Sequence, residues 1–392
     1  MSAVPKLRFN EFSHFWTAES IQQISHFVTS GSRDWAKLYS DDGAKFLRMT
    51  NLPKIGTDLL LSDMKYVTIP QNSTDGRRTS IEKGDILISI TAELGKIGYV
   101  KEDLGEAYVN QHLALVRPQK NIVSPKFVAE MLASEKCRAE INRLNDAGAK
   151  AGLNLPTIRK FKISIPSLPE QQKIASFLSS LDKKIDLLRR KKDALELYKK
   201  GLMQKIFSQE IRFKQDDGSD FPEWEEMRLE EVADMKAGKF IKASKISPTN
   251  QYGFFPCYGG NGLRGYVRTS NQEGRYVLIG RQGALCGNVA ITTGKFYATE
   301  HAVVTRAKSG NEIDWLFYQL EKMDLNQYAI GVAQPGLSVT SLNSLATLVP
   351  SRPEQAKIAS FLSTIDTKIA SVASQLEQME SFKEGLLQQM FV

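Results

Sequence analysis

The sequence predicts an α+β protein: two mixed α/β domains separated by two long antiparallel helices that form a coiled coil, with a pseudo-two-fold internal repeat. Two observations predict this fold. The segment PEQQKIASFLSSLDKKI at Pro169 returns as PEQAKIASFLSTIDTKI at Pro353, 184 residues later, and a β-rich stretch of roughly 150 residues precedes each copy. We therefore expect domains at residues 1–165 and 209–349, a central helix at 166–208 and a C-terminal helix at 350–392.

The repeated segments have the pattern of a coiled-coil seam. They are alike over roughly forty residues, about half of them identical, and their apolar residues recur in alternating steps of four and three. Each copy opens with a Ser-x-x-Glu capping box, Ser167 to Glu170 and Ser351 to Glu354, followed by a proline in the first turn. The expected seam residues are Ile174, Leu178, Leu181, Ile185 and Leu188 in the first copy and Ile358, Leu362, Ile365, Ile369 and Val372 in the second.

A seam this narrow needs an apolar partner, and the simplest partner for each helix is the other copy. If a pseudo-two-fold axis relates the repeats, the helices run antiparallel. Each would be about 50 Å long at a rise of 1.5 Å per residue, and the domains would lie at opposite ends. The alternative is that each helix packs on its own domain or on another chain.

Two kinds of residue do not fit a purely internal apolar seam. Lys192, Lys199 and Lys383 occupy seam positions, where a charge needs a partner or must extend to solvent. Gly201 and Gly385 lie in the last helical turns, where glycine costs about 1 kcal/mol relative to alanine. The matching glycines indicate either a closely approaching second helix, for which another subunit is one source, or a tolerated surface glycine that was duplicated. We therefore group Lys199, Gly201, Lys383 and Gly385 with the seam residues as partner-docking or coiled-coil positions.

The domains repeat more loosely than the helices. Trp16 and Trp224 lie at corresponding places in the opening segments of the two domains. The strand-rich runs GDILISITAELGKIGYV and GRYVLIGRQGALCGNVAI also correspond. NQHLALVRP and TEHAVVTRA follow them, which places His112 opposite His301. Histidines in this setting are more typical of buried strand ends than of ligands or catalytic bases.

Composition narrows the classes of function. The 392 residues carry a net charge of +8 with a pI of about 9.1, which favours a polyanionic partner. Three scattered cysteines fit a reducing cytoplasm better than a disulfide framework, and four histidines without paired cysteines predict no metal site. No apolar run approaches the ~20 residues of a membrane span, so we expect a cytoplasmic protein with no membrane contact.

Residue types suited to nucleic acid gather in both domains. Arginine can bond guanine, asparagine and glutamine can bond adenine, and lysine and backbone amides hold phosphates. The DNA-binding candidates are Arg48, Asn51, Lys54, Arg77, Arg78, Thr91 and Lys96 in the first domain and Gly260, Asn261, Arg264, Arg268, Arg281, Gln282 and Lys295 in the second. The basic run Arg189-Arg190-Lys191-Lys192 has no counterpart in the second helix, and we expect it to face DNA or an acidic partner surface.

The sequence resembles the specificity subunit of type I restriction–modification enzymes over nearly its whole length. The resemblance rests on the paired P-E-Q-x-K-I-A-x-F-L helices, the L-R-F…F…W openings, and YGGNG…GYV…YVLIGRQGALCGNV…FYATEHA in the second half. It implies that each domain is a target recognition domain that reads one half of a bipartite, asymmetric site in double-stranded DNA. The helices would set the spacer between the half-sites. The SITAELG segment of the first domain lacks the residues of IGRQGA, so its contacts are the less defined.

The resemblance also implies partners and cofactors. Two modification subunits carrying S-adenosylmethionine would dock on the helices for adenine-N6 methylation, and restriction subunits using ATP and magnesium would complete the nuclease. This chain would hold no cofactor and no catalytic residue. Its sequence has no Pro-Pro step of an adenine-binding motif, no G-x-x-x-x-G-K-[ST] phosphate loop and no Pro-Asp step of a nuclease site. The alternatives are a self-contained nuclease or methyltransferase with unfamiliar motifs, and a coiled-coil scaffold without sequence-specific binding.

Overall fold

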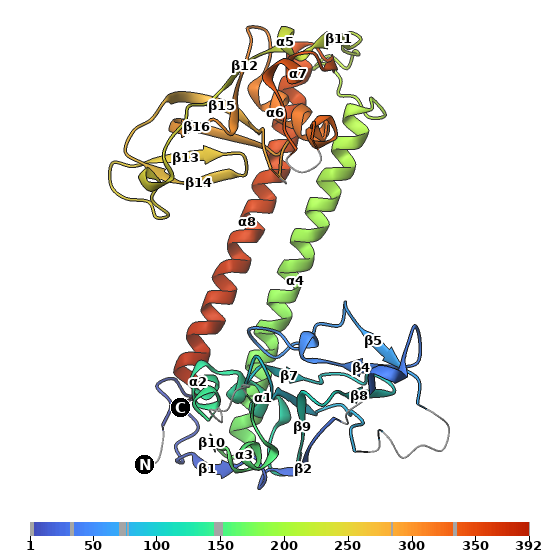
Figure 1. Cartoon of the computed structure of the whole chain (residues 1–392), viewed down its shortest axis with the longest axis vertical. Helices are drawn as coiled ribbons and strands as arrows, with labels where there is room; N and C mark the ends of the chain where they lie inside the picture. Colours follow the sequence, from blue (N-terminus) through green and yellow to red (C-terminus); the bar gives the residue numbers. More distant parts are fainter. Residues whose placement is uncertain are drawn as a thin grey trace. The chain divides into compact units, whose positions relative to one another are not determined.

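The contacts of the computed structural model divide the chain into two units (Figure 1). The structure describes residues 4–31, 35–69, 76, 78–144, 152–283, 285–331 and 335–391. Unit 1 comprises Met1–Leu188 and Gln375–Val392, and unit 2 comprises Arg189–Ser374. Because the unit boundaries fall inside both long helices, each unit holds one mixed domain, the start of one helix and the end of the other. The four-segment division expected from the sequence stays a prediction.

In the described part of unit 1, strands form three sheets. The first has the order β2-β9-β6-β7 and is antiparallel, the second has the order β3-β5-β4-β8, and β1 pairs with β10. The strands are β1 Thr17–Ser20, β2 Ser25–Ser30, β3 Tyr39–Ser40, β4 Ala44–Leu47, β5 Lys65–Val67, β6 Ile86–Ser89, β7 Ile97–Tyr99, β8 Ala107–Val109, β9 Leu113–Pro118 and β10 Lys162–Ile165. The helices are η1 Trp35–Leu38, η2 Met49–Asn51, α1 Pro125–Ala133, α2 Glu135–Arg143, α3 Leu155–Lys160 and the first part of α4 Leu168–Phe207.

In unit 2 a six-stranded sheet takes the place of the two larger sheets of unit 1. Its order is β12-β17-β15-β16-β13-β14, and β11 pairs separately with β18. The strands are β11 Glu225–Arg228, β12 Ala233–Ala237, β13 Phe255–Gly259, β14 Gly262–Val267, β15 Gln272–Gly280, β16 Val289–Ala298, β17 Ala302–Ala307 and β18 Ala346–Val349. The helices are α5 Leu229–Val232, η3 Ala243–Lys245, α6 Ile313–Lys322, η4 Leu325–Tyr328, α7 Val339–Asn343 and the first part of α8 Arg352–Met390.

The two domains share one plan. In both, one strand of an antiparallel pair lies directly before the long helix, β10 in unit 1 and β18 in unit 2, and a parallel ladder joins β4 with β8 in unit 1 and β13 with β16 in unit 2. In unit 2 the long strand β16 pairs with both β15 and β13. In unit 1 these two pairings are divided between β7, which pairs with β6, and β8, which pairs with β4, because residues 100–106 interrupt the strand. Repeated domains are therefore present, as the sequence predicts.

Each domain core contains the start of one long helix and the end of the other. In unit 1, Ile174 and Leu178 of α4 share a buried cluster with Leu386, Met390 and Phe391 at the end of α8. Since the start of one helix meets the end of the other, the two helices run antiparallel there. The same core contains Trp16 and Phe127 of the domain, so each helix packs both on its domain and on its copy.

Unit 2 repeats this arrangement with the helices exchanged. Met203, Ile206 and Phe207 at the end of α4 share a buried cluster with Ile358 and Leu362 at the start of α8. From the sequence, packing on the other helix and packing on the own domain are alternatives. In each unit both occur together.

The first turn of each long helix is fixed by a buried carboxylate. Glu170 accepts hydrogen bonds from Arg8 Nε (2.7 Å), Arg8 Nη2 (2.7 Å) and Trp16 Nε1 (3.3 Å). In the second repeat Glu354 accepts from Arg212 Nε (3.3 Å), Arg212 Nη2 (3.0 Å) and Trp224 Nε1 (3.0 Å). The repeated glutamate therefore binds the opening segment of its domain.

This result corrects the expected capping box of the second helix. There the hydroxyl of Ser351 is buried without a hydrogen-bond partner among the described residues, while the carboxylate of Glu354 is occupied by Arg212 and Trp224. The buried carboxylate pairs with arginine in preference to capping the helix, because an unpaired buried charge costs several kcal/mol.

The glutamine of the P-E-Q motif joins the same helix turn to the domain helix. Gln171 Nε2 donates to Pro166 O (2.9 Å), and its Oε1 accepts from the N-cap amide of α1 at Ser124 (2.9 Å). Gln355 likewise donates to Pro350 O (2.8 Å) and accepts from the N-cap amide of α6 at Glu312 (2.8 Å). The motif thus attaches each long helix to its own domain.

Replacing Glu354 by leucine should lower the free energy of unfolding by about 3 kcal/mol, because Arg212 would keep its charge in a largely buried place without a carboxylate. Equilibrium urea unfolding followed by circular dichroism measures this. Glu223→Gln is the matched control. Glu223 pairs with the same Arg212 at 3.5 Å but is 92% exposed, so its loss should change stability by less than about 0.5 kcal/mol. Equal losses in the two variants would contradict the assigned role of Glu354.

Candidate nucleic-acid interface

The candidate site lies where the same three segments meet in each domain. In unit 2, the amide of Arg281 donates to His301 O (3.0 Å) and that of Thr299 donates to Tyr258 O (2.9 Å). These bonds hold together the end of β13, the loop after β15 and the start of β17. The loop after β15 is the IGRQGA segment singled out in the sequence.

Unit 1 uses the same backbone frame. The amide of Ile90 donates to His112 O (3.0 Å), and that of Asn110 donates to Leu47 O (3.0 Å). The bridge of Thr91 with Gly152 matches the bridge of Gln282 with Gly336. Thr91 and Gln282 therefore occupy equivalent places in the two domains.

Close packing of the loops in unit 2 depends on glycine. A Cβ built on Gly280 would lie 2.0 Å from the carbonyl oxygen of Gly260, far inside contact distance. The YGGNG hairpin can therefore approach the IGRQGA loop only while residue 280 has no side chain.

Four of the predicted residues in unit 2 come together around one concavity. Gly260, Asn261, Arg264 and Gln282 line a depression of about 460 Å³ together with His301. Asn261, Arg264 and Gln282 are exposed. An arginine, an asparagine and a glutamine converging on an open surface can donate to base edges or phosphates.

The other three candidates of unit 2 lie apart from the lining of this concavity. Arg268 is exposed just after β14, and its guanidinium carbon lies 5.6 Å from the centroid of the Phe254 ring. Lys295 is exposed in β16, with Glu273 at 3.9 Å. Arg281 is half-buried, and its Nε is buried without a partner in the described chain. Its counterpart in unit 1 is the buried Ile90, whereas Gln282 is exposed.

In unit 1 the segment after β4 is more enclosed. Arg48 Nη2 binds the carboxylate of Asp63 at 2.9 Å. Asn51 is fully buried, with its Oδ1 accepting from Arg48 N (2.9 Å) and its Nδ2 donating to the carbonyls of Leu60 (2.8 Å) and Asp63 (3.1 Å). This burial removes Asn51 from the residues we propose to contact bases, because its amide is used to shape the loop.

The remaining candidates of unit 1 are basic residues on or near the surface. Lys96 pairs with Glu93 at 2.7 Å, and the charges of Lys96 and Lys54 lie near enough to hold the pKa of Glu93 below its usual value, chiefly through the Lys96 hydrogen bond. Lys54 and Arg78 are exposed. Arg77 lies outside the described residues. Lys96 is therefore already neutralised, whereas Lys54 and Arg78 present charge to solvent.

The histidines form part of this surface, which sequence reasoning missed. His112 Nδ1 lies 2.9 Å from Thr91 Oγ1, and its Nε2 lies 3.2 Å from Gln111 Nε2. His301 Nε2 lies 3.2 Å from Glu300 Oε1 and its side chain is 40% exposed. The alignment that placed His112 opposite His301, next to the candidate loop, was the available signal.

The chemistry of the described residues gives no catalytic constellation. No cluster of three His, Cys, Asp or Glu side chains able to hold a metal occurs among them. Burial raises the pKa of Cys257 to about 11, and also raises that of Cys286, which keeps both thiols protonated.

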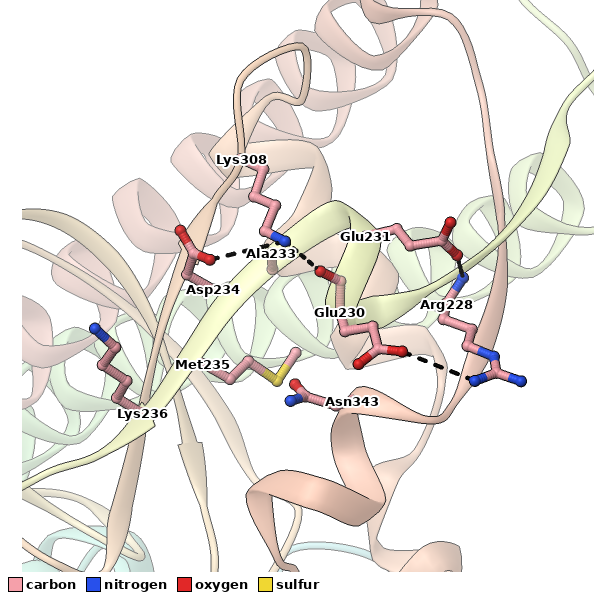
Figure 2. A pocket seen from close by; sticks show the side chains of 9 residues that line it. All are labelled: Arg228, Glu230, Glu231, Ala233, Asp234, Met235, Lys236, Lys308 and Asn343. Atoms are coloured by element: carbon pink, nitrogen blue, oxygen red, sulfur yellow. Dashed lines mark hydrogen bonds and ion pairs between the residues drawn. The ribbon is translucent and has the colours of Figure 1, made fainter.

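A further concavity of unit 2 is balanced in charge (Figure 2). Lys308 Nζ donates to Glu230 O (2.5 Å) and lies 3.9 Å from Asp234, Arg228 lies 3.8 Å from the Glu230 carboxylate, and the amide of Arg228 donates to Glu231 (2.7 Å). Five of its six charged side chains take part in these contacts, and the sixth, Lys236, is exposed.

The predicted helix residues are mostly buried. Ile174, Leu178, Ile185 and Leu188, and likewise Ile358, Leu362, Ile365 and Val372, are less than 9% exposed, while Leu181 and Ile369 are half-buried. Of the basic run, Arg189, Arg190 and Lys191 are exposed, and Lys192 is half-buried and pairs with Glu196 at 2.7 Å. Lys192 thus extends outward from its seam position.

Neither of the two helix glycines is packed closely against another part of the described chain. A Cβ built on Gly201 or Gly385 meets no atom of the described chain within 4 Å. No helix of the described chain therefore approaches either residue. A docking role for them stays a prediction.

None of the helices in the described part of the chain is long and apolar enough to cross a membrane.

Comparison with known proteins gives one consistent family. The model of the Type I restriction modification DNA specificity domain matches residues 29–197 and again residues 222–381. The EcoprrI specificity subunit of Escherichia coli is 48% identical over 136 residues, which are 34% of this chain and 33% of that protein. The putative MjaX specificity subunit of Methanocaldococcus jannaschii is 27% identical over 235 residues, 57% of this chain and 54% of that protein. The matches thus span about a third to a half of these relatives.

Solved structures share the fold. The type I restriction–modification S subunit from M. genitalium has a TM-score of 0.65 at 17% identity and covers 100% of this chain and 99% of its own. A chain from a study of complex assembly and conformational transition of the type I R-M system has a TM-score of 0.56 at 18% identity, covering 96% and 97%.

Gly280→Ala should destabilise the chain by about 1–3 kcal/mol, because the new methyl group collides with the Gly260 carbonyl and forces the two loops apart. Thermal unfolding measures the loss, and hydrogen exchange at residues 258–262 locates it. Gly336→Ala, whose Cβ would lie 3.6 Å from its nearest neighbour in the same loop cluster, should be nearly neutral. If both variants unfold like the parent chain, the loops are not packed as described.

Proposed function

Because the chain belongs to the family of type I restriction–modification DNA specificity proteins, we propose that it recognises a bipartite, asymmetric site in double-stranded DNA, with each domain reading one half-site. The observation that carries this proposal is the repeated loop frame. Equivalent backbone bonds present Thr91 in one domain and Gln282 in the other, on surfaces whose remaining residues differ. Two domains that share a backbone arrangement but differ in their surface side chains are suited to recognising two different half-sites.

We assign the reading surface of the second domain to Asn261, Arg264 and Gln282. They are exposed, converge on one concavity and have the donors that bond purine edges in the major groove. Gly260 allows the close approach of the hairpin, and Arg268 and Lys295 would bind phosphates. In the first domain the surface comprises Thr91 with the basic residues Lys54 and Arg78, and Arg48 and Lys96 contribute only if they leave their acidic partners.

The proposed role is recognition without catalysis. Modification subunits carrying S-adenosylmethionine would methylate adenine, and restriction subunits would use ATP and magnesium, in a cytoplasmic complex. The net charge of +8 supports a polyanionic partner. Charge is unevenly divided between the helices: α4 has ten basic and five acidic residues, α8 has four and five. We therefore expect α4 to be the helix whose exposed side faces DNA or an acidic partner.

We propose that the modification subunits dock at two equivalent places on the helices. Tyr198 and Phe382 are 56% and 54% exposed, and each lies one turn before a glycine with open space around it, Gly201 and Gly385. An exposed aromatic ring next to a glycine with open space around it is a suitable binding site for a helix of another subunit. Two such sites in equivalent positions fit two copies of one partner.

Arg264→Ala and Gln282→Ala should each weaken binding to the target site by about 1–3 kcal/mol, about 5-fold to 150-fold, because each removes one proposed base contact. Binding is measured by fluorescence anisotropy at fixed salt, with the target mapped first from methylated adenines in cells. Lys236→Ala removes one exposed positive charge elsewhere in the same domain and serves as the control. A specific site predicts that the two variants lose discrimination at one half-site only. Equal losses on target and scrambled DNA would show that binding is merely electrostatic.

Gly201→Ala and Gly385→Ala should each stabilise the isolated chain by about 1 kcal/mol, because alanine is the better helix former and meets no atom. Each should also weaken binding of the modification subunit, whose helix would meet the new methyl group. Thermal unfolding of the chain and titration calorimetry with the modification subunit separate the two effects. Unchanged affinity in both variants would remove the glycines from the docking surface.

A further inference from the structure

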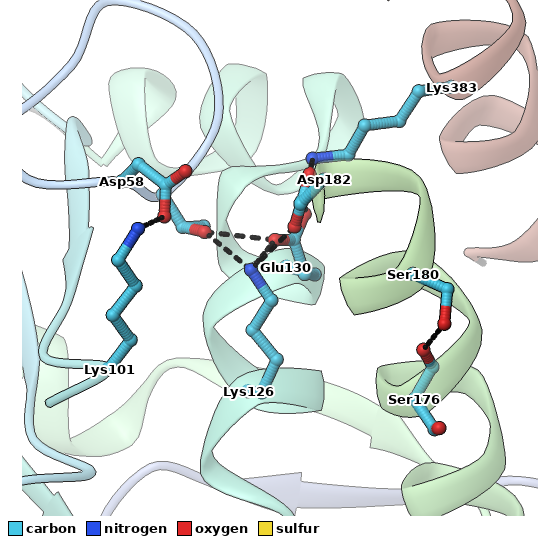
Figure 3. Close-up of polar contacts among 9 residues, drawn as sticks. Asp58, Lys101, Lys126, Glu130, Ser176, Ser180, Asp182 and Lys383 are labelled. Carbon is cyan, nitrogen blue, oxygen red and sulfur yellow. Dashed lines mark hydrogen bonds and ion pairs between the residues drawn. The ribbon is translucent and has the colours of Figure 1, made fainter. Parts of the chain in front are cut away.

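In unit 1 a closed ring of four charges joins three helices (Figure 3). Lys383 Nζ of α8 lies 2.5 Å from Asp182 Oδ1 of α4, and Lys126 Nζ of α1 lies 3.0 Å from Asp182 Oδ2. Glu130 of α1 closes the ring, with Oε1 at 2.6 Å from Lys126 and Oε2 at 3.8 Å from Lys383. Each charge therefore has an opposite charge on both sides.

The ring is mostly shielded from solvent. The side chains of Glu130, Lys126, Lys383 and Asp182 are 0%, 13%, 14% and 20% exposed. Burial alone would raise the pKa of Asp182, but the charges of Lys126 and Lys383 outweigh it and hold that pKa below its usual value. Removing one member would leave an uncompensated charge in this place.

Unit 2 has a corresponding cluster on the equivalent helices. Lys199 Nζ of α4 lies 2.8 Å from Asp366 Oδ1 of α8 and 3.3 Å from Glu321 Oε2 of α6. Tyr318 of α6 donates its hydroxyl to Asp366 Oδ2 at 2.6 Å, as Lys126 Nζ donates to Asp182 Oδ2 in unit 1. These contacts show where two of the seam lysines find their partners.

The two clusters share only the aspartate–lysine pair between the long helices. Asp182 and Asp366 are 184 residues apart, as are Lys199 and Lys383, so the same pair occurs once in each unit. The domain helices supply different groups around it, a lysine and a glutamate in α1 but a tyrosine and a glutamate in α6. Because only this pair is common to both units, its role lies in the pairing of the two long helices with each other.

The other seam positions do not define one register. Apart from Lys192, whose side chain extends outward to Glu196, they are apolar and repeat every seven residues, so a shift of one helix by a heptad would again oppose mainly apolar residues to apolar residues. Such a shift would place Leu376 or Met390 opposite Asp182, where Lys383 now lies. Burying Asp182 against an apolar side chain is costly, and only the native register avoids it in both units.

We propose that Asp182–Lys383 and Asp366–Lys199 select the register in which α4 pairs with α8, and that this register sets the length of DNA left unread between the half-sites. The second part rests on the proposed function. One heptad corresponds to about 10 Å along a helix, and hence to about 3 base pairs of DNA.

The test compares the parent chain with a variant that has all four residues replaced by leucine (Asp182→Leu, Asp366→Leu, Lys199→Leu, Lys383→Leu). Lys126 and Glu130 still balance each other in this variant. Spin labels on cysteines introduced at the exposed positions Lys183 of α4 and Gln389 of α8, both in unit 1, report the register through their distance. Two comparison variants are made: Asp182→Glu with Lys383→Arg, which keeps the charges, and Lys192→Gln with Glu196→Gln, which removes an exposed pair within one helix.

The four-leucine variant should give a second distance, because a shift of one heptad moves one helix about 10 Å along the other, whereas both comparison variants should keep the single parental distance. A single unchanged distance in a folded four-leucine variant would overturn the proposal. If that variant is unfolded, a variant that removes the same four charges with smaller changes in side-chain volume (Asp182→Asn, Asp366→Asn, Lys199→Met, Lys383→Met) is tested in the same way, and an unchanged distance there has the same meaning. Mapping methylated sites in cells carrying the variant then tests the spacer: a shifted distance with an unchanged spacer would leave the register role standing and reject its link to the DNA.

Discussion

The structure depends on the burial of the end of each long helix in the core of one domain. In unit 1 the ring of Phe391 meets that of Phe127 at 5.6 Å, although 264 residues separate them. In unit 2 the ring of Phe207 meets that of Trp224 at 6.4 Å. Neither core is complete without a helix end, so the antiparallel pairing of the helices is a consequence of domain folding as much as of the seam.

The repeated motif divides its work between two tasks. Its polar residues attach each helix to the adjacent domain, the glutamate through an arginine and a tryptophan and the glutamine through the N-cap of α1 or α6. Its apolar residues fill the core and the seam. Because attachment of the helix start and burial of the helix end both involve the domain, side chains on the reading loops can vary without disturbing the helices. The scaffold is thus independent of the variable surface side chains. A protein that reads different sequences with one architecture needs this independence.

Much of the architecture could be predicted because it repeats. Two copies of a four-three apolar pattern predicted the helices to within about two residues, and the paired tryptophans and histidines predicted equivalent domains. The capping box of the second helix was wrong because Glu354 has a nearer cationic partner, Arg212, which is separated from it by 142 residues. Sequence spacing cannot reveal a contact over that distance.

The candidate surface was predicted unevenly, for a related reason. Residue type suggested Asn51 and Gln282 equally, but a loop that closes on itself buries the first, and a glycine-packed hairpin exposes the second. Arg281 and Gln282 are neighbours in the sequence, yet the first is half-buried and the second exposed, as expected where strand-like backbone alternates its side chains. Which of two adjacent polar residues faces solvent is decided by the register of the loop, which the residue types do not specify.

The central claim is that the end of α8 is part of the first domain's core, and hydrogen exchange of Phe391→Ala tests it most directly. The account predicts that amides of α1, centred on Phe127, lose protection, while those of α6 in unit 2 exchange as in the parent chain. Unchanged protection of α1, or a uniform loss in both helices, would contradict it.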